Sequence, residues 1–456
     1  MKRNNKFCTR VLAVMLAGMI LSASACGVWK EETSSAVSQQ STSSQASASS
    51  RLPDDKPAWN EVSSLGVVPS RLNTTVPQVN TPFSCAKMQL EYEKLPSQAT
   101  KQIYDEMLRV VSKITLSRND YGEYRTERIF LAGVELQEQE LRLALTAFRS
   151  DHPQIFWITN HFGYDSGPQG TSVELYSYYS EKECQLRIQK LEQAVREICA
   201  GLSKDQNLFD RELKLHDTLL EKVTYDKSAV DSADTPESFT AYGALVEGKA
   251  VCQGYALAMK LLLCYAGIES SVFSGNVQGV AHAWNAVLLN NQWYFLDPTW
   301  NDTETHIRYD YFNITTEALM QDHTIDPVYP DESSTEQCNL WLPDCIATEE
   351  NYYMRCAIYM DGFDAENDER LLTKLQTMLA TGNTVLNIRF DPEMDYDKSL
   401  AMLITEKPYK LVYLMQRANQ MYGSVNLFSM NNIQYSQIKA QHAVTIRLEL
   451  ETTEIQ

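Results

Sequence analysis

The chain has 456 residues and a formal net charge of −19 at pH 7, with 59 acidic against 40 basic side chains. This charge balance repels nucleic acid and anionic membrane surfaces, and so argues against both as partners. The seven histidines have no metal-ligand spacing, and the ten cysteines form no Cys-x-x-Cys pair or disulfide framework. We therefore expect no metal and no other cofactor.

Residues 1–25 have the pattern of a secretion signal. A basic start is followed by a short apolar run, Val11–Leu21, and by small residues just before Cys26. The run is too short for an ordinary membrane-spanning helix. Small residues directly before a cysteine resemble a bacterial lipoprotein cleavage site. We expect the mature chain to begin at Cys26, with a lipid on this thiol that anchors it to the outer face of the bacterial cell membrane. Plain secretion, with Cys26 incidental, is the alternative.

Residues 26–82 are predicted to be a disordered tether. Its part from 33 to 50 consists of Ser, Thr, Ala, Gln and Val without charge, and such a run cannot bury a core. Five prolines recur between Arg51 and Pro82, which indicates a stiffer continuation of the same linker.

Residues 83–203 are predicted to form an α+β domain without a catalytic role. Two helices have apolar residues on one face, the first with Ile103, Met107, Val110, Val111 and Ile114, and the second with Leu141, Ala144, Leu145 and Phe148. Strands are expected at 155–158 and 173–179, and a third helix at 186–199. His152 follows the second helix, and we expect a capping role for it.

Residues 204–325 are predicted to be the catalytic domain. A helix at 206–224 carries His216 on its apolar stripe, where a hydrogen-bonded core histidine is the expected role. A polar loop follows at 226–239. The run from Tyr255 to Gly267 is apolar nearly all round and closes on a glycine, so we expect a buried central helix with Cys252 in its first turn.

Two runs of strand character follow, separated by Asn290-Asn291, a favoured hairpin turn pair. A hairpin folded there pairs residue 289 with 292 and places His282 opposite Thr299. Asp297 then lies on the same face as His282, one diagonal step away, at roughly 7–8 Å between backbones and within side-chain reach.

Cys252, His282 and Asp297 are the types needed for covalent thiol catalysis. A thiolate is the nucleophile, an imidazole moves the proton, and a carboxylate fixes the imidazole tautomer. Taken singly, each has a structural alternative as a core cysteine, a packed histidine or a turn aspartate. Their order along the chain and the hairpin parity favour a triad.

The stretch from about Leu213 to Asp302 resembles the transglutaminase-like superfamily, in its bacterial extracellular branch. The resemblance rests on four segments: 215–226, 241–256 around Cys252, 279–285 around His282, and 293–301 around Asp297. It implies a papain-like fold with Cys252 as nucleophile, His282 as general base and acid, and Asp297 as the residue that orients it. The family includes crosslinkers, proteases, amidases and members without activity.

Further parts of the site also have candidates in the sequence. Backbone N–H groups at the helix start are expected to bind the oxyanion. Tyr242 or Gln253 are candidates for an additional side-chain donor, and Trp284 and Trp300 for walls of an acyl channel. Structural roles are the alternative for all four.

Residues 346–456 alternate strand and helix, with strands expected at 354–360, 384–390 and 444–450 and a helix at 367–381. The expected fold class is therefore α+β: a papain-like, transglutaminase-like core, with the cysteine at the start of a central helix packed on an antiparallel sheet, flanked by further α+β domains.

The expected function is a surface-anchored, cysteine-dependent acyl-transfer enzyme that acts on protein or peptide amide bonds, by crosslinking or by hydrolysis. Its location suggests cell-wall peptides and neighbouring surface proteins as substrates. The alternative is a surface binding module that uses the same fold without catalysis, and an exported maturation factor for one dedicated client is a third possibility.

Overall fold

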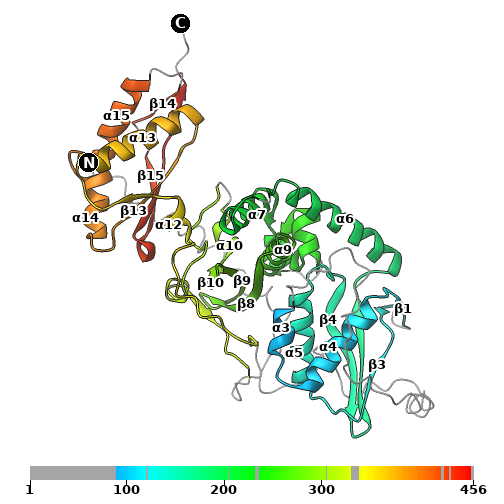
Figure 1. The fold of residues 1–456 in the computed structure, drawn as a ribbon. Coiled ribbons are helices and arrows are strands. Elements are labelled where there is room, and N and C mark those ends of the chain that lie inside the picture. Colours follow the sequence, from blue (N-terminus) through cyan, green and yellow to red (C-terminus); the bar gives the residue numbers. More distant parts are fainter. Residues whose placement is uncertain are drawn as a thin grey trace. The chain divides into compact units, whose positions relative to one another are not determined.

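The computed structural model describes residues 89–119, 122–203, 205–231, 236–303, 306–329, 338–422, 426–430 and 433–452. The predicted signal, the tether and Cys26 lie outside these residues. No helix within the described ranges is long and apolar enough to cross a membrane. The chain divides into two units (Figure 1), the first with the described residues up to Arg308 and Asp322–Asp344, the second with Tyr309–Gln321 and the residues from Cys345 onward.

The first unit begins with helices and one antiparallel sheet. Its helices are α3 (Leu90–Lys94), α4 (Gln98–Val111), α5 (Glu138–Asp151) and α6 (Glu181–Cys199). The sheet runs β1 (Ser117–Arg118), β2 (Tyr124–Arg125), β5 (Gly170–Ser177) and β3 (Ile129–Ala132), and β4 (Ile158–Gly167) also pairs with β5. The predicted apolar faces of α4 and α5 are buried. Two predictions were wrong in their bounds: Ile114 lies beyond the end of α4, and β4 begins at Ile158, the last residue of the predicted strand, and runs on to Gly167.

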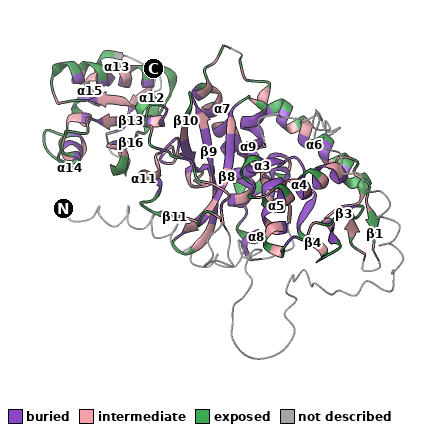
Figure 2. Cartoon of the chain, turned by 60° about the horizontal axis from the view of Figure 1, so that its bottom comes forward, coloured by how far each residue is buried: buried purple, intermediate pink, exposed green. Residues whose placement is uncertain are grey.

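The second half of this unit is built on a buried helix. α9 (Cys252–Tyr265) packs on β8 (Glu269–Val277) and β9 (Val280–Leu289), with α7 (Leu208–Lys222) beside it. Nearly every residue of α9 is buried, as its apolar sequence predicts. The helix ends before Gly267, whose φ of 79° suits a residue without a side chain. Figure 2 shows that β8 and β9 are largely buried.

The central sheet is antiparallel, in the order β10 (Gln292–Leu296), β9, β8 and β11 (His323–Ile325). Short elements lie between α7 and α9: β6 (Thr224–Tyr225), α8 (Lys227–Asp231), η3 (Pro236–Phe239), η4 (Gly243–Glu247) and β7 (Lys249–Ala250). The predicted loop at 226–239 is therefore partly helical.

A buried polar network joins the two halves of this unit. Asp151 at the end of α5 accepts the backbone N–H groups of Glu91 and Tyr92, and lies 3.4 Å from Nζ of Lys260 on α9. Glu91 in turn accepts a hydrogen bond from Ser271 on β8. Because these groups are buried and satisfy one another, the first half packs on the second in a defined arrangement. His152 is the C-cap of α5, as predicted, and shares a hydrogen bond with the Tyr104 hydroxyl.

The second unit contains a four-stranded sheet in the order β12 (Ile358–Met360), β13 (Val385–Phe390), β16 (Ala443–Arg447) and β15 (Gln434–Ile438). β12 is parallel to β13, and the other pairs are antiparallel. β14 (Asn426–Phe428) pairs separately with β17 (Leu450–Thr452). The helices are α11 (Thr316–Leu319), α12 (Tyr352–Cys356), α13 (Ala365–Thr381), α14 (Tyr396–Leu400), η5 (Ala401–Thr405), α15 (Lys410–Tyr422) and η6 (Lys439–Gln441).

The predicted strand at 354–360 was half wrong. Asn351 caps α12 by accepting the N–H of Tyr353, so the chain is helical up to Cys356 and the strand begins only at Ile358. The predicted final strand is divided between β16 and β17.

Candidate functional site

Cys252 is the first residue of α9, which is the position that the sequence predicted. The preceding residue, Val251, is extended, and its N–H is held by the Ser238 carbonyl, so the chain turns sharply into the helix. The sulfur is not in a disulfide, and the residue is only 1% exposed. The partial positive charge of a helix N-terminus favours an anion at this position.

The hairpin that supplies the other two residues has the predicted register. Asn290 and Asn291 both have positive φ, 48° and 66°, which is the requirement of a type I′ turn. Gln292 pairs with Leu289, and the ladder continues to Leu296 opposite Asn285.

The predicted pairing of His282 with Thr299 was wrong, because the strand stops at Leu296. Pro298 lacks an N–H and begins the short helix α10 (Pro298–Asn301). Asp297 caps this helix: its Oδ1 accepts the N–H groups of Thr299 at 2.9 Å and Trp300 at 3.1 Å. The turn role and the site role expected of Asp297 thus fall on different oxygens of one carboxylate.

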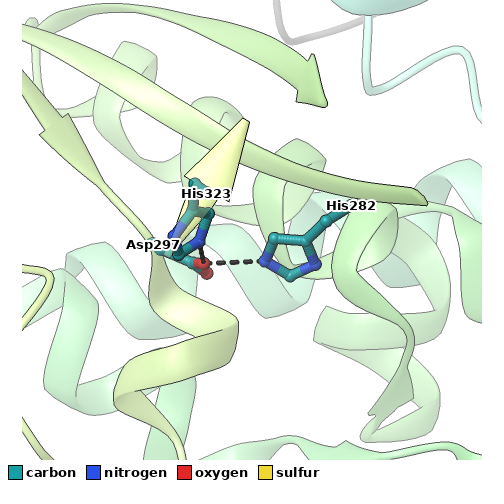
Figure 3. A group of neighbouring side chains, drawn as sticks. All are labelled: His282, Asp297 and His323. Carbon is teal, nitrogen blue, oxygen red and sulfur yellow. Dashed lines mark hydrogen bonds and ion pairs between the residues drawn. The ribbon is translucent and has the colours of Figure 1, made fainter. Parts of the chain in front are cut away.

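The second oxygen of Asp297 holds His282. Nε2 of His282 lies 2.7 Å from Oδ2 of Asp297 (Figure 3). His282 is 8% exposed and Asp297 is fully buried. Burial lowers the pKa of His282, but the Asp297 charge, the Asp297 hydrogen bond and a hydrogen bond with Cys252 outweigh it and raise the pKa to about 9. Burial opposes ionisation of Asp297, but the two histidines beside it hold its pKa below the ordinary range.

Oδ2 of Asp297 thus holds the imidazole of His282, and the Cys252 side chain is close enough to that imidazole to contribute to the raised pKa of His282. An imidazolium next to a thiol stabilises the thiolate, and a buried carboxylate stabilises the imidazolium. In chemical terms, the arrangement can hold a nucleophile and a proton donor next to one another.

His323 is the site residue that sequence reasoning missed. It begins β11, and its Nε2 lies 3.2 Å from the same Asp297 oxygen that His282 contacts, as Figure 3 shows. Its ring is packed against Trp300 at 5.0 Å and Trp284 at 5.3 Å between centroids. His323 is 26 residues beyond Asp297, with no spacing pattern to mark it. Its position depends on β8, a strand that the sequence analysis did not predict.

His282, Asp297 and His323 place one potential ligand atom each within 4.8 Å of one another, a grouping that the histidine spacing did not suggest. Each imidazole Nε2 is within hydrogen-bond distance of Asp297, so proton-mediated bonds account for the grouping. We assign no metal to it.

The four further candidates lie in different surroundings. Trp300, in α10, packs against the rings of His282 and His323. The Trp284 indole is fully buried and stacks on His282 at 6.0 Å between centroids. Gln253 is the second residue of α9 and is partly exposed. Tyr242 stacks on Phe156 at 4.7 Å between centroids, and the Arg187 guanidinium lies over its ring at 5.1 Å.

Residues 192–298 match the family model described as the Transglutaminase-like superfamily. This range includes Cys252, His282 and Asp297 and ends before His323. Among curated proteins, none matches the chain.

Three solved structures have partial likeness to the chain. One described as a TGase is 16% identical, with a TM-score of 0.26, over 46% of this chain and 61% of that one. A presumed cysteine protease from Cytophaga hutchinsonii is 14% identical, with a TM-score of 0.21, over 29% and 55%. The periplasmic domain of TgpA from Pseudomonas aeruginosa is 14% identical, with a TM-score of 0.18, over 41% and 73%. The chain thus spans about three fifths of the first of these structures and less of the second. Residues 192–298 are thus similar to the transglutaminase-like superfamily, within an α+β chain.

Proposed function

We propose that the chain is a cysteine-dependent acyl-transfer enzyme that acts on protein or peptide amide bonds. The observation that supports this most directly is the hydrogen bond between His282 and Asp297, together with the contribution of Cys252 to the raised pKa of His282 and the position of Cys252 at the start of α9. The match of this stretch to the transglutaminase-like superfamily model supports the same reaction class.

The reaction proceeds in two halves. The Cys252 thiolate attacks the amide carbonyl carbon, and the carbonyl oxygen becomes an oxyanion. When the tetrahedral intermediate collapses, the C–N bond breaks, His282 gives its proton to the departing amine, and a thioester remains. A second amine or a water then attacks the thioester, gives its proton to His282, and releases the Cys252 sulfur.

Asp297 keeps Nε2 of His282 as the donor on its own side, which leaves Nδ1 as the ring nitrogen for proton exchange with Cys252. The first-turn N–H groups of α9 are the nearest donors for the oxyanion, because the helix starts at the nucleophile itself. The partly exposed Gln253 is a candidate for contact with the substrate.

The surface location is part of the same proposal. A lipid on Cys26 and the tether to residue 82 would place the enzyme outside the cell membrane, near extracellular proteins and cell-wall peptides. An acceptor amine would give a crosslink, and water would give proteolysis or deamidation.

The test uses the full chain, its Cys252→Ala variant and a Cys199→Ala control, which removes a thiol from α6. Each is incubated with a glutamine-containing protein and a tagged primary amine, and products are followed by intact mass. Amine incorporation that requires Cys252 indicates transglutamination. Cleavage or deamidation that requires Cys252, without incorporation, indicates a hydrolase. Equal products from all three proteins would contradict the proposal for these substrates and favour the binding-module alternative.

A further inference from the structure

His323 is held between two carboxylates. Its Nε2 lies 3.2 Å from Oδ2 of Asp297, and its Nδ1 lies 2.6 Å from Oδ1 of Asp322, the residue before it. The ring is 1% exposed and Asp297 is fully buried, whereas the Asp322 side chain is 35% exposed. Both ring nitrogens therefore face an acceptor.

This geometry specifies the protonation state of His323. An ionised carboxylate only accepts hydrogen bonds, and a neutral imidazole donates from one nitrogen only. Bonds to two carboxylates at once require the doubly protonated imidazolium. The same conclusion follows from its pKa: burial lowers it, but the bonds to Asp297 and Asp322 raise it to about 9.

Asp297 consequently has two cationic neighbours. His282 and His323 approach the same oxygen, Oδ2, and their rings lie 5.6 Å apart between centroids. The charge of His323 attracts Asp297 and opposes a second positive charge on His282.

We propose that His323 is a positioning residue, permanently cationic at neutral pH, that fixes Asp297 and limits how strongly Asp297 holds the proton of His282. The catalytic consequence of this inference rests on the proposed function, in which His282 is a general acid and must release its proton. Without His323, Asp297 would serve His282 alone, and the imidazolium would be a weaker acid.

The residues of β8 that pair with β11 carry no charge. Val277 lies opposite His323, and Asn276 and Gly275 lie opposite the next two residues of β11. The indoles of Trp284 and Trp300 pack against the His323 ring. Asp297 and Asp322 are the titratable groups at its two ring nitrogens, and the His282 ring lies beside it.

The first test measures the protonation of His323 directly. The full chain is labelled with ¹⁵N-histidine, and the His323 signals are identified by their loss in His323→Gln. We expect both ring nitrogens of His323 to be protonated at pH 7. A neutral tautomer at that pH would overturn the proposal.

The second test follows His282 in the same spectra as the pH is raised. His323→Gln keeps an amide donor near Asp297 but removes the charge. At 5.6 Å, loss of that charge should raise the midpoint of His282 titration by roughly one to two pH units. Asp322→Asn, which keeps an acceptor for Nδ1 but removes the negative charge that favours the His323 imidazolium, should give a smaller shift in the same direction. An unchanged or lower midpoint in His323→Gln would contradict the proposal.

A fold control is available in His216, which bonds Asp217 and Asn301 in the same unit and should keep its signals in each variant. Once a substrate is found, His323→Gln should lower kcat and leave KM unchanged, because His323 is buried away from solvent. The two proposals can fail separately. If amine incorporation and hydrolysis do not depend on Cys252, the proposed function fails. The positioning role remains if His323 is an imidazolium and its loss changes the midpoint of the His282 titration.

Discussion

Asp297→Asn is the substitution that most directly tests the electrostatics of the site. The pKa of His282 is about 9 against an ordinary 6.5, a net rise of roughly 2.5 units, or roughly 3 kcal/mol in favour of the imidazolium. The contribution of Asp297 is larger than this net value because burial opposes it. Without the carboxylate charge, the pKa of His282 should fall below 6.5. Its protonated share at pH 7.5 then drops from about 97% to under about 10%.

The consequence can be measured without a known substrate, through the alkylation of Cys252 by iodoacetamide. Below pH 7 a thiolate persists only if an imidazolium stabilises it. At pH 6.5 we therefore expect Asp297→Asn to slow alkylation of Cys252 by about tenfold or more, with the difference vanishing above about pH 9, where thiols ionise unaided. Peptide mass spectrometry resolves the sites, and the exposed Cys356 reports the intrinsic pH dependence of the reagent.

The control is Asp310→Asn, which alters a buried carboxylate of the second unit that accepts the Tyr353 hydroxyl. It should leave the alkylation of Cys252 unchanged. Equal rates for the wild type and Asp297→Asn at pH 6.5, with both folded, would refute the electrostatic reasoning.

Three further predictions concern stability. The raised pKa values of His282 and His323 mean that their stabilisation is complete below about pH 6.5 and is lost as pH rises through about 9. Urea titrations should therefore show that the difference in unfolding free energy between the wild type and Asp297→Asn shrinks from pH 6.5 to about 9. A constant difference would contradict this stabilisation by the protonated histidines. Lys260→Met leaves buried Asp151 without its cation and should cost about 3 kcal/mol. Adding Asp151→Asn should restore part of that loss, and simple additivity of the two changes would count against the pairing. Asn291→Val should cost about 1 kcal/mol because φ is 66°, whereas Asn291→Gly should be nearly neutral; equal urea midpoints for the two variants would exclude this explanation.

Much of the core was predictable because its signals are local. The apolar run after Cys252 specifies a buried helix, Gly267 ends it, and Asn290-Asn291 sets the hairpin register. Each of these features can be predicted from the chemistry of residues that are adjacent in the sequence. The second unit was less predictable, because the Asn351 cap makes helical a segment whose composition favours a strand.

Asp297 shows why the local interpretation remained incomplete. Its position before Pro298 predicted a turn, and its parity with His282 predicted a partner for the imidazole. The structure satisfies both, since Oδ1 caps α10 and Oδ2 accepts from His282. The cap orients the carboxylate plane by two backbone N–H bonds and so directs Oδ2 toward the imidazole of His282.

His323 could not be found in this way, because it reaches the site through pairing rather than through sequence proximity. β11 is placed by hydrogen bonds to β8, and β8 alone connects it to β9, where Gly275 pairs with His282. A Cβ at Gly275 would lie 2.0 Å from the Thr324 carbonyl oxygen and 2.6 Å from Trp284. The absence of a side chain at Gly275 therefore permits the close approach of β11. The contact between His323 and Asp297 is thus encoded by a glycine two strands away from the carboxylate, a signal that becomes interpretable only once the sheet order is known.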